Sequence, residues 1–293
     1  MTPYHYDYAV IGGDLRQTYL ALELTKSKSA VCSFALCQPA QTNAVKTFSS
    51  LEAAVSNSSC IVCPVPFTKD GIFLNQNAIK GNLALRQFPM MVKPDQTFFA
   101  GAIPKEIQKA FSQTGVPVFD FLKDDTLACF NTVATAEGVI CEAIQHSPIN
   151  LSKSKCAVLG YGKCGRVITA KLKAMPCHVT AVSASPKETA QAAVFADEAL
   201  SLDQFFSKID AYDFIFNTIP AVILTNDVLA RTNPAVTILD IASEPGGVDF
   251  AAAKELSRSA RKCPSLPGKY APLSSARALY NSIKTFERRL PCL

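Results

Sequence analysis

The 293-residue sequence has few charged residues and few histidines. Asp, Glu, Lys and Arg make up 18% of the chain, and the formal net charge is +5 at pH 7. The basic residues are scattered and form no basic stripe, which argues against nucleic-acid binding. Of the three histidines, His5 lies in the N-terminal tail, His146 ends a predicted helix and His178 begins a predicted strand. None of them is expected to be catalytic.

Long apolar segments and targeting signals are also missing. The sequence shows no apolar stretch that we expect to span a bilayer, and its first ten residues lack the basic and apolar regions of a signal peptide. We therefore expect a cytoplasmic protein with no membrane partner. The hydrophobic content of 48% predicts a globular chain, long enough for two domains.

The eleven cysteines have no regular spacing. Most lie in apolar, strand-like runs, which favours buried thiols in a reducing compartment over a disulfide framework. Cys60 and Cys63 form a C-x-x-C pair, but no second pair accompanies them and the flanking residues are apolar. Neither a metal site nor a redox site is therefore predicted.

The second half of the sequence contains a glycine-rich turn. An apolar run at 156–159 is followed by Gly160, Gly162 and Gly165 at G-x-G-x-x-G spacing, then by a helical pattern and a second apolar run at 179–182. Strand, glycine turn, helix and strand in this order predict a dinucleotide site. The first glycine permits the turn, the second the approach of a pyrophosphate and the third close helix packing, while the helix N-terminus attracts phosphates. The residues assigned to this turn are Gly160, Gly162, Lys163, Cys164, Gly165 and Arg166.

The choice between NAD and NADP depends on the residues at the end of the second strand, where an acidic residue would bind the 2′-hydroxyl of NAD. No acidic residue occurs there before Glu188. Ser183, Ser185 and Lys187 suit a 2′-phosphate better, which favours NADP, although small residues at this point leave NAD open.

Six strands can be counted from Cys156 onward, in the order 3-2-1-4-5-6 that dinucleotide-binding domains use. They are expected near 156–160, 178–183, 194–196, 213–218, 236–242 and 260–265. The fourth strand then neighbours the first, which places Asn217, Thr218 and Pro220 beside the nicotinamide ribose. Asp240, at the end of the fifth strand, either orients the ribose or nicotinamide amide or caps the next turn.

The first half begins as a second Rossmann-like unit, with a strand at 6–11 and further strands at 30–36, 60–65, 97–100 and 116–119. Its glycine fingerprint is incomplete because Gln17 or Thr18 occupies the third position, and no dinucleotide is placed here. Arg16, at a helix N-terminus, is a candidate for a substrate carboxylate. The loop with Thr68 and Lys69 is either a ligand site or a solvated turn.

These patterns predict an α/β fold of two Rossmann-like doubly wound domains joined by a bridging helix. The expected parts are a substrate domain at 1–133, the bridging helix at 134–150, an NAD(P) domain at 151–270 and a C-terminal helix at 271–293. That last helix should pack back on the first domain through Ala276, Leu279, Tyr280, Ile283, Phe286 and Leu290. Glu137, near the start of the bridging helix, either only interacts favourably with the helix dipole or acts in catalysis.

Seven motifs together resemble the A-subunit family of dipicolinate synthase. They are AVIGGDLRQ at 9–17, CPVPFTKDG at 63–71, ATAEG at 134–138, VLGYGKCGR at 158–166, NTIP at 217–220, ILDIASEPGGVDF at 238–250 and LPGKYAP at 266–272. The resemblance implies oxidation of a dihydrodipicolinate, formed from 4-hydroxy-tetrahydrodipicolinate, to pyridine-2,6-dicarboxylate with NAD(P)+. It also implies a flavoprotein-like B-subunit of dipicolinate synthase as partner and action in the mother-cell cytoplasm during sporulation, and it leaves a homo-oligomer open.

Within that resemblance, Glu137 is the expected catalytic base, and Arg16 joins it in the catalytic site. The substrate-binding candidates are Thr68, Lys69, Thr135 and Lys269. An arginine expected after the second strand of the cofactor domain is Ala184 here, which weakens the case for NADP. The alternatives are another two-domain dehydrogenase, of the 2-hydroxyacid or alanine type, and a non-catalytic NADP-sensing module.

Overall fold

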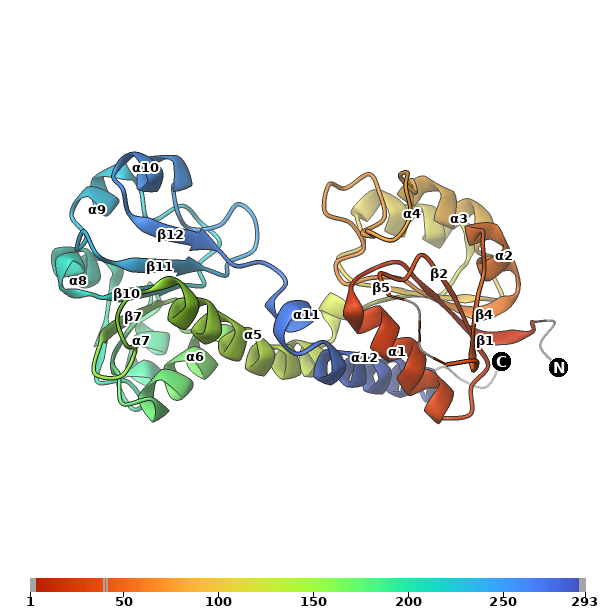
Figure 1. Ribbon diagram of the computed structural model, residues 1–293, viewed down its shortest axis with the longest axis horizontal. Coiled ribbons are helices and arrows are strands. Elements are labelled where there is room, and N and C mark those ends of the chain that lie inside the picture. Colours follow the sequence, from red (N-terminus) through yellow and green to blue (C-terminus); the bar gives the residue numbers. More distant parts are fainter. Residues whose placement is uncertain (1–3, 39, 41, 290–293) are drawn as a thin grey trace. The chain divides into compact units, whose positions relative to one another are not determined.

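The computed structural model describes residues 4–38, 40 and 42–289. The chain divides into two compact units, which we call unit 1 (1–131 with 271–293) and unit 2 (132–270). Each unit contains a six-stranded parallel sheet with helices on both faces (Figure 1). The predicted class, two Rossmann-like α/β domains, is confirmed.

The sheet of unit 1 has the order β3-β2-β1-β4-β5-β6, and every neighbouring pair is parallel. Its strands are β1 (Tyr6–Ile11), β2 (Val31–Phe34), β3 (Val45–Thr47), β4 (Ser58–Val62), β5 (Thr97–Ala100) and β6 (Val118–Asp120). The sequence pattern missed β3. That strand has three residues of which only Val45 is buried, so no apolar run signals it.

Helices cover both faces of this sheet. They are α1 (Leu15–Lys26), α2 (Leu51–Ser56), α3 (Phe88–Met91), α4 (Lys105–Thr114) and α12 (Pro272–Glu287), with short 3-10 turns η1 (Leu85–Gln87) and η2 (Phe121–Lys123). In Figure 1, α1 and α12 lie together on one face and α2, α3 and α4 on the other, as the two apolar clusters of the unit require. Leu20 and Leu24 of α1 pack with Ala276, Leu279 and Ile283 of α12. The C-terminal helix therefore packs back on the first domain, whereas Leu290 lies outside the described residues.

A polar cluster also fixes α12 to the sheet. The buried Tyr8 hydroxyl of β1 donates to Glu287, while Lys284 Nζ lies 2.6 Å from the Tyr8 hydroxyl and 3.0 Å from Glu287 Oε2. Burial and the neighbouring Glu287 carboxylate raise the pKa of Tyr8 far above its usual value. The folded structure therefore favours the neutral phenol at this position.

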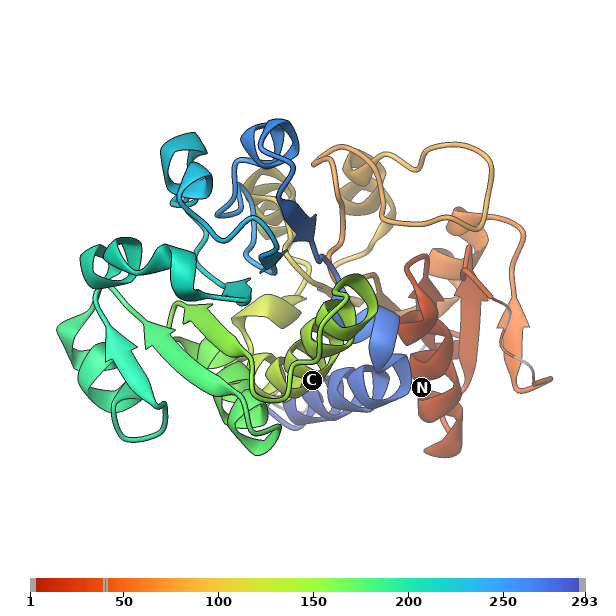
Figure 2. The same cartoon turned by 60° about the vertical axis from the view of Figure 1, so that its left-hand side comes forward.

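The sheet of unit 2 has the order β12-β11-β10-β7-β8-β9, again with all neighbours parallel (Figure 2). Its strands are β7 (Lys155–Leu159), β8 (His178–Val182), β9 (Glu198–Leu200), β10 (Phe214–Asn217), β11 (Thr237–Asp240) and β12 (Ser259–Lys262). Counted from β7 this is the predicted order 3-2-1-4-5-6. The helices are α6 (Lys163–Ala174), α7 (Pro186–Ala192), α8 (Leu202–Ser207), η3 (Ile209–Ala211), α9 (Asn226–Ala230), α10 (Phe250–Glu255) and α11 (Leu266–Tyr270).

One predicted strand of unit 2 is wrong. Residues 194–196 form the turn after α7, where Val194 is 75% exposed and Phe195 is 65% exposed. Their N–H groups donate to Gln191 and Ala192, so they continue the end of the helix. The third strand is β9, four residues later, and its three residues have too little apolar content to mark it in the sequence.

The predicted bridging helix is α5 (Asp125–His146), which begins nine residues before 134. Asp124 explains the early start, because its carboxylate accepts hydrogen bonds from the N–H groups of Thr126 and Leu127. The boundary between the two units, at 131/132, falls inside this continuous helix.

By length and composition alone, α5 could cross a membrane, contrary to the expectation from the sequence. Its most apolar window has a mean hydropathy of 1.3, and 50% of that window is buried inside the protein. A helix that packs in the core of an α/β unit passes the same test, so this feature is weak support for a membrane span.

Candidate functional site

The glycine turn after β7 has the geometry of a phosphate-binding loop. Gly160 has a φ of +91°, and a Cβ there would lie 2.3 Å from Thr218 Oγ1. A Cβ on Gly165 would lie 1.9 Å from the Gly160 carbonyl oxygen. A Cβ on Gly162 would meet no atom within 4 Å. The first and third glycines are therefore required by the chain itself, whereas the second faces open space that a ligand can enter.

Helix α6 begins at this open space. Gly162 is its extended N-cap residue and provides no side-chain cap, and the helix continues for 12 residues. Backbone N–H groups and the positive end of a helix of this length suit an anion such as a pyrophosphate. The residues present therefore fit a dinucleotide.

Arg166 and Cys164, both assigned to the cofactor, serve the turn itself. Arg166 Nε donates to the Tyr161 carbonyl at 3.0 Å, and its Nη2 donates to Gln191 on α7 at 2.6 Å. Burial raises the pKa of the Cys164 thiol, which packs on the apolar core of unit 2. The Arg166 guanidinium thus joins the glycine turn to α7, and its direct contact with the cofactor stays a prediction.

The end of β8 carries an acidic group that the sequence pattern did not place there. The Ser183 hydroxyl is buried and donates to Glu188 Oε2 at 2.6 Å. Ser185 caps α7, since its hydroxyl accepts the Glu188 N–H at 3.4 Å. Both hydroxyls predicted to bind a 2′-phosphate are therefore engaged with Glu188, and Lys187 alone is exposed. A cavity of about 430 Å³ opens beside Ser183 and Ala184, lined by small and polar residues of α7, β9 and α8.

Asn217 and Asp240 bind each other at the ends of β10 and β11. The Asn217 amide donates to Asp240 Oδ1 at 2.8 Å and to the Ile219 carbonyl at 3.0 Å. Asp240 also accepts the N–H groups of Ala242 at 3.1 Å and Gly247 at 2.9 Å. Because Asn217 is 0% exposed and Asp240 is 1% exposed, neither side chain is open to a ligand. Of the two roles considered for Asp240, capping of the next turn is the one observed.

The neighbouring Thr218 and Pro220 remain at the edge of the sheet. The Thr218 hydroxyl donates to the Leu159 carbonyl at 2.9 Å, which joins the end of β10 to the end of β7. Pro220 is exposed. Thr218 lies beside the glycine turn, and the place of Thr218 and Pro220 near the nicotinamide ribose stays a prediction.

In unit 1, the predicted substrate ligand Arg16 is bound internally. Its Nε and Nη2 donate to the two oxygens of Asp14 at 2.9 and 2.7 Å, and Nη2 also donates to the Val65 carbonyl. Burial opposes ionisation of Asp14, but the hydrogen bonds and charge of Arg16 hold the pKa of Asp14 below its usual value, helped by Lys69. With its side chain 8% exposed, Arg16 is bound to Asp14 and the loop after β4, and its contact with a substrate carboxylate stays a prediction.

The first glycine turn is filled by the chain. Gln17 is buried, and its amide lies 3.3 Å from the Val62 carbonyl. A Cβ on Gly13 would lie 2.5 Å from Gln17 Cγ, and the Gly13 N–H donates to the Asn75 carbonyl at 2.8 Å. These contacts occupy the space that a pyrophosphate would need, in agreement with the incomplete fingerprint.

The loop after β4 is an ordered turn with an exposed lysine. The Thr68 hydroxyl accepts the Gly71 N–H at 3.0 Å and donates to Asp70. Backbone N–H groups of Phe73 and Ile72 bind the Asp70 carboxylate and lower its pKa. Thr68 is therefore a turn-forming residue, and Lys69 is the exposed cation at its tip.

Glu137 does not lie where the sequence pattern placed it. Because α5 begins at Asp125, Glu137 is in the middle of the helix and not at its N-terminus. Its side chain is 56% exposed and pairs with Lys171 of α6 at 2.8 Å. A solvent-exposed ion pair accounts for this placement without a catalytic role, and the assignment of Glu137 as a catalytic base stays a prediction. Thr135, two residues earlier in the same helix, is half-buried.

Sequence reasoning missed a buried acid in the same helix. Glu142 Oε1 accepts the Tyr270 hydroxyl at 2.8 Å and the ammonium of Lys269, and its Oε2 lies 3.2 Å from His146 Nε2. The sequence feature that could have revealed it is a glutamate on the apolar face of the helix that contains Val139 and Ala143.

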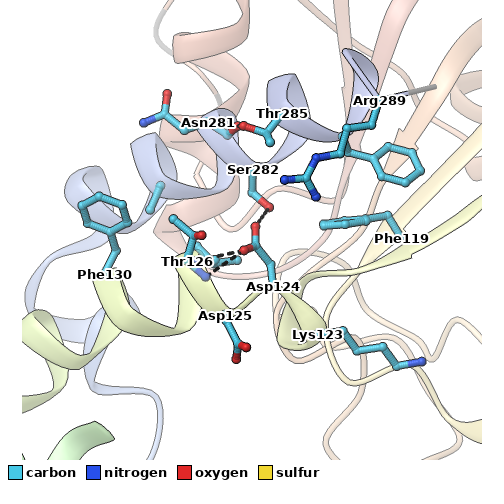
Figure 3. A pocket seen from close by; sticks show the side chains of 13 residues that line it. Phe119, Lys123, Asp124, Asp125, Thr126, Phe130, Asn281, Ser282, Thr285 and Arg289 are labelled. Atoms are coloured by element: carbon cyan, nitrogen blue, oxygen red, sulfur yellow. Dashed lines mark hydrogen bonds between the residues drawn. The ribbon is translucent and has the colours of Figure 1, made fainter. Parts of the chain in front are cut away.

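A separate cavity of about 320 Å³ lies in unit 1, between the start of α5 and α12 (Figure 3). Phe119, Phe130 and Arg289 line it, and a hydrogen bond from the Ser282 hydroxyl to Asp124 crosses it. None of the predicted site residues lines this cavity.

Two family models match the chain in succession. Residues 7–122 match the N-terminal domain of the dipicolinate synthase A-subunit, and residues 132–242 match the NAD-binding domain of D-isomer specific 2-hydroxyacid dehydrogenases. A curated relative, the dipicolinate synthase A-subunit of Bacillus subtilis, is 29% identical over 93% of this chain and 93% of its own. The chain is a relative of the dipicolinate synthase A-subunit. The resemblance stated from the motifs is therefore confirmed.

Solved structures of such relatives have the same fold. The A chain of dipicolinate synthase from Bacillus subtilis superposes with a TM-score of 0.83 at 26% identity, covering 97% of this chain and 96% of that one. The corresponding protein from Bacillus halodurans gives a TM-score of 0.86 at 24% identity over 96% and 97%. The NAD-binding model and the dehydrogenase fold together indicate an oxidoreductase with a nicotinamide cofactor.

Proposed function

We propose that this chain is the A-subunit of a dipicolinate synthase. In this proposal it oxidises a dihydrodipicolinate, derived from 4-hydroxy-tetrahydrodipicolinate, to pyridine-2,6-dicarboxylate with NAD(P)+. The observation that carries the proposal is the open glycine turn of unit 2, present in one chain with the N-terminal domain typical of the dipicolinate synthase A-subunit. That domain separates this chain from a generic 2-hydroxyacid dehydrogenase.

The residues of unit 2 would bind and orient the cofactor. The N-terminus of α6 would hold the pyrophosphate, while Thr218 and Pro220 would border the nicotinamide ribose. The bond between Asn217 and Asp240 keeps the sheet edge rigid beneath them. The bound nicotinamide would supply the hydride acceptor, and aromatisation of the ring favours its transfer.

A dianionic substrate requires cations. Arg16 is bound to Asp14, and Lys69 and Lys269 are the exposed lysines among the predicted substrate ligands. A lysine ammonium is a compact charge with three donors and suits a carboxylate.

We propose NAD as the preferred cofactor, with NADP as the alternative that the sequence favours. The Glu188 carboxylate lies at the end of β8, 2.6 Å from the Ser183 hydroxyl. A carboxylate at this place can accept the ribose 2′-hydroxyl and repels a 2′-phosphate. Lys187 is the residue that supports NADP. Variants of Lys187 and Glu188 distinguish a preference for NAD from a preference for NADP.

The partner and the compartment are part of the proposal. Their names describe one subunit of a synthase, which implies a further subunit, and we propose a flavoprotein-like B-subunit of dipicolinate synthase as the partner. We also propose that the complex works in the mother-cell cytoplasm of a sporulating bacterium. Co-purification of the two proteins from sporulating cells would test both statements.

The test of the function is a coupled absorbance assay. Purified chain is mixed with freshly generated 4-hydroxy-tetrahydrodipicolinate and NAD+ or NADP+, with and without the B-subunit. Simultaneous growth of the reduced-nicotinamide and pyridine-2,6-dicarboxylate bands is the expected result. Nucleotide binding without turnover when the partner is present would instead support the sensing module, and turnover of a 2-hydroxy acid would support another dehydrogenase.

A further inference from the structure

Unit 2 contains a cluster in which three side chains bind one buried carboxylate. Glu142 of α5 receives Lys269 and Tyr270 from α11 and His146 from its own helix. The side chain of Glu142 is 6% exposed, but that of Lys269 is 57% exposed. The cluster therefore joins a hidden anion to a cation that faces solvent.

The helix that carries Lys269 is packed tightly in place. A Cβ on Gly138 of α5 would lie 2.8 Å from Tyr270 Cδ2 and 3.0 Å from Leu266 Cβ, so α11 packs directly on the helix backbone. The Lys269 ammonium also lies 4.9 Å from the Tyr270 ring centroid. Lys269 is thereby held from two sides.

Its place in the fold is the carboxyl edge of the sheet. Asn217, Asp240 and Lys262 are register partners at the ends of β10, β11 and β12, and α11 begins at Leu266, directly after β12. Ligands of open α/β sheets bind outside this edge. Helix α11, which carries Lys269, therefore follows this edge of the sheet directly.

An ion pair on the protein surface can form between two exposed side chains, so the burial of Glu142 needs another explanation. Lys208 and Glu198 form such a pair at 2.6 Å with side chains 52% and 34% exposed. Removing a carboxylate from water, as in Glu142, costs free energy that good geometry must offset. Burial alone would raise the pKa of Glu142, but the bonds from Lys269 and Tyr270 lower it, and the same contact raises the pKa of Lys269. Glu142 is thus kept ionised, and its lowered pKa makes it a weaker proton acceptor than a free carboxylate.

We propose that Lys269 binds a carboxylate of the substrate and that Glu142 is the positioning residue that aims its ammonium. The identity of that substrate as a pyridine dicarboxylate rests on the proposed function. The arrangement assigns Tyr270 and His146 as supports of Glu142, and neither Glu142 nor His146 belongs to a motif.

The test is calorimetric binding of pyridine-2,6-dicarboxylate to the full chain at saturating nicotinamide dinucleotide. Lys269→Met should weaken binding about tenfold or more, Lys269→Arg should restore part of it, and Glu142→Gln should weaken it about threefold to tenfold. Pyridine-2-carboxylate serves as the comparison, because loss of Lys269 should reduce the preference for the dicarboxylate. Nucleotide affinity, measured by fluorescence, should not change.

Lys208→Met is the matched control, since it removes an equally exposed, carboxylate-paired lysine of the same unit and should leave binding unchanged. Lys269→Met removes a cationic partner of the buried Glu142 carboxylate, so urea unfolding accompanies the binding measurements. Lys269→Arg keeps that charge and should fold in any case. Equal binding by wild type and Lys269→Met would overturn the assignment of Lys269 alone. Absence of binding by wild type would overturn the proposed function, and the assignment with it.

Discussion

Asn217 and Asp240, 23 residues apart in sequence, form a buried 2.8 Å hydrogen bond at the carboxyl ends of neighbouring strands. Each also binds the backbone of the loop that follows its strand, so the bond fixes two loops at once. The edge on which a dinucleotide would lie is therefore shaped by residues that do not face it.

Replacing Asp240 with asparagine should destabilise unit 2. The asparagine oxygen can keep the place of Oδ1, but the amide nitrogen then replaces Oδ2 and cannot accept the Gly247 N–H. This leaves a buried donor unsatisfied at a cost of about 1–3 kcal/mol. Urea unfolding should show this loss together with weaker nucleotide binding. Asp210→Asn, at an exposed acid of the same unit, is the control and should leave both unchanged.

Substitutions of the second and third glycines of the turn should have different effects, the one on nucleotide binding and the other on stability. Gly162→Asp places a negative side chain in open space and should lower nucleotide affinity at least about 100-fold while the melting temperature holds. Gly165→Ala brings a Cβ to 1.9 Å from the Gly160 carbonyl and should destabilise by about 3 kcal/mol or more. Nucleotide titration and thermal unfolding distinguish them, and a stable Gly165→Ala protein would contradict the packing argument.

Cofactor preference should depend on Glu188. Glu188→Gln removes the charge beside Ser183 and should raise the affinity for NADP relative to NAD about tenfold. Lys187→Met should have little effect if NAD is preferred, and should weaken NADP binding if the sequence-based preference is right. Competitive titration of the wild type and the two variants with NAD and NADP measures this preference.

Glu137→Gln should retain turnover within about twofold of wild type, because the residue forms a solvent-exposed pair with Lys171 that contributes at most about 1 kcal/mol. The assay is the one that tests the function. A large loss of kcat without a change in substrate binding would restore Glu137 as the base.

Alkaline stability should depend on Tyr8. Its pKa is raised in the folded protein, so its contribution is complete below the ordinary tyrosine pKa of about 10 and is lost above it, by up to about 1.4 kcal/mol per pH unit. Tyr8→Phe should therefore flatten the fall in unfolding free energy above pH 10 relative to wild type. Tyr19→Phe, at a half-buried tyrosine of α1, controls for a general tyrosine effect. Parallel slopes for Tyr8→Phe and wild type would refute the prediction.

The sequence determined the fold because its signals are local. Apolar runs marked the strands, and G-x-G-x-x-G spacing marked a turn whose first and third positions tolerate no Cβ. Short strands such as β3 and β9 escaped, since three partly exposed residues give no periodic pattern. The motif set also sufficed to identify the relatives.

Only the tertiary structure decided which polar side chains face a ligand and which face each other. Arg16 and Glu137 look available in sequence, yet Asp14 and Lys171 occupy them. Glu142 looks like an ordinary helix residue, yet Lys269, 127 positions away, binds it. Hydrogen bonds and ion pairs depend on distances between side chains from separate elements, and neither periodicity nor motif spacing encodes those distances.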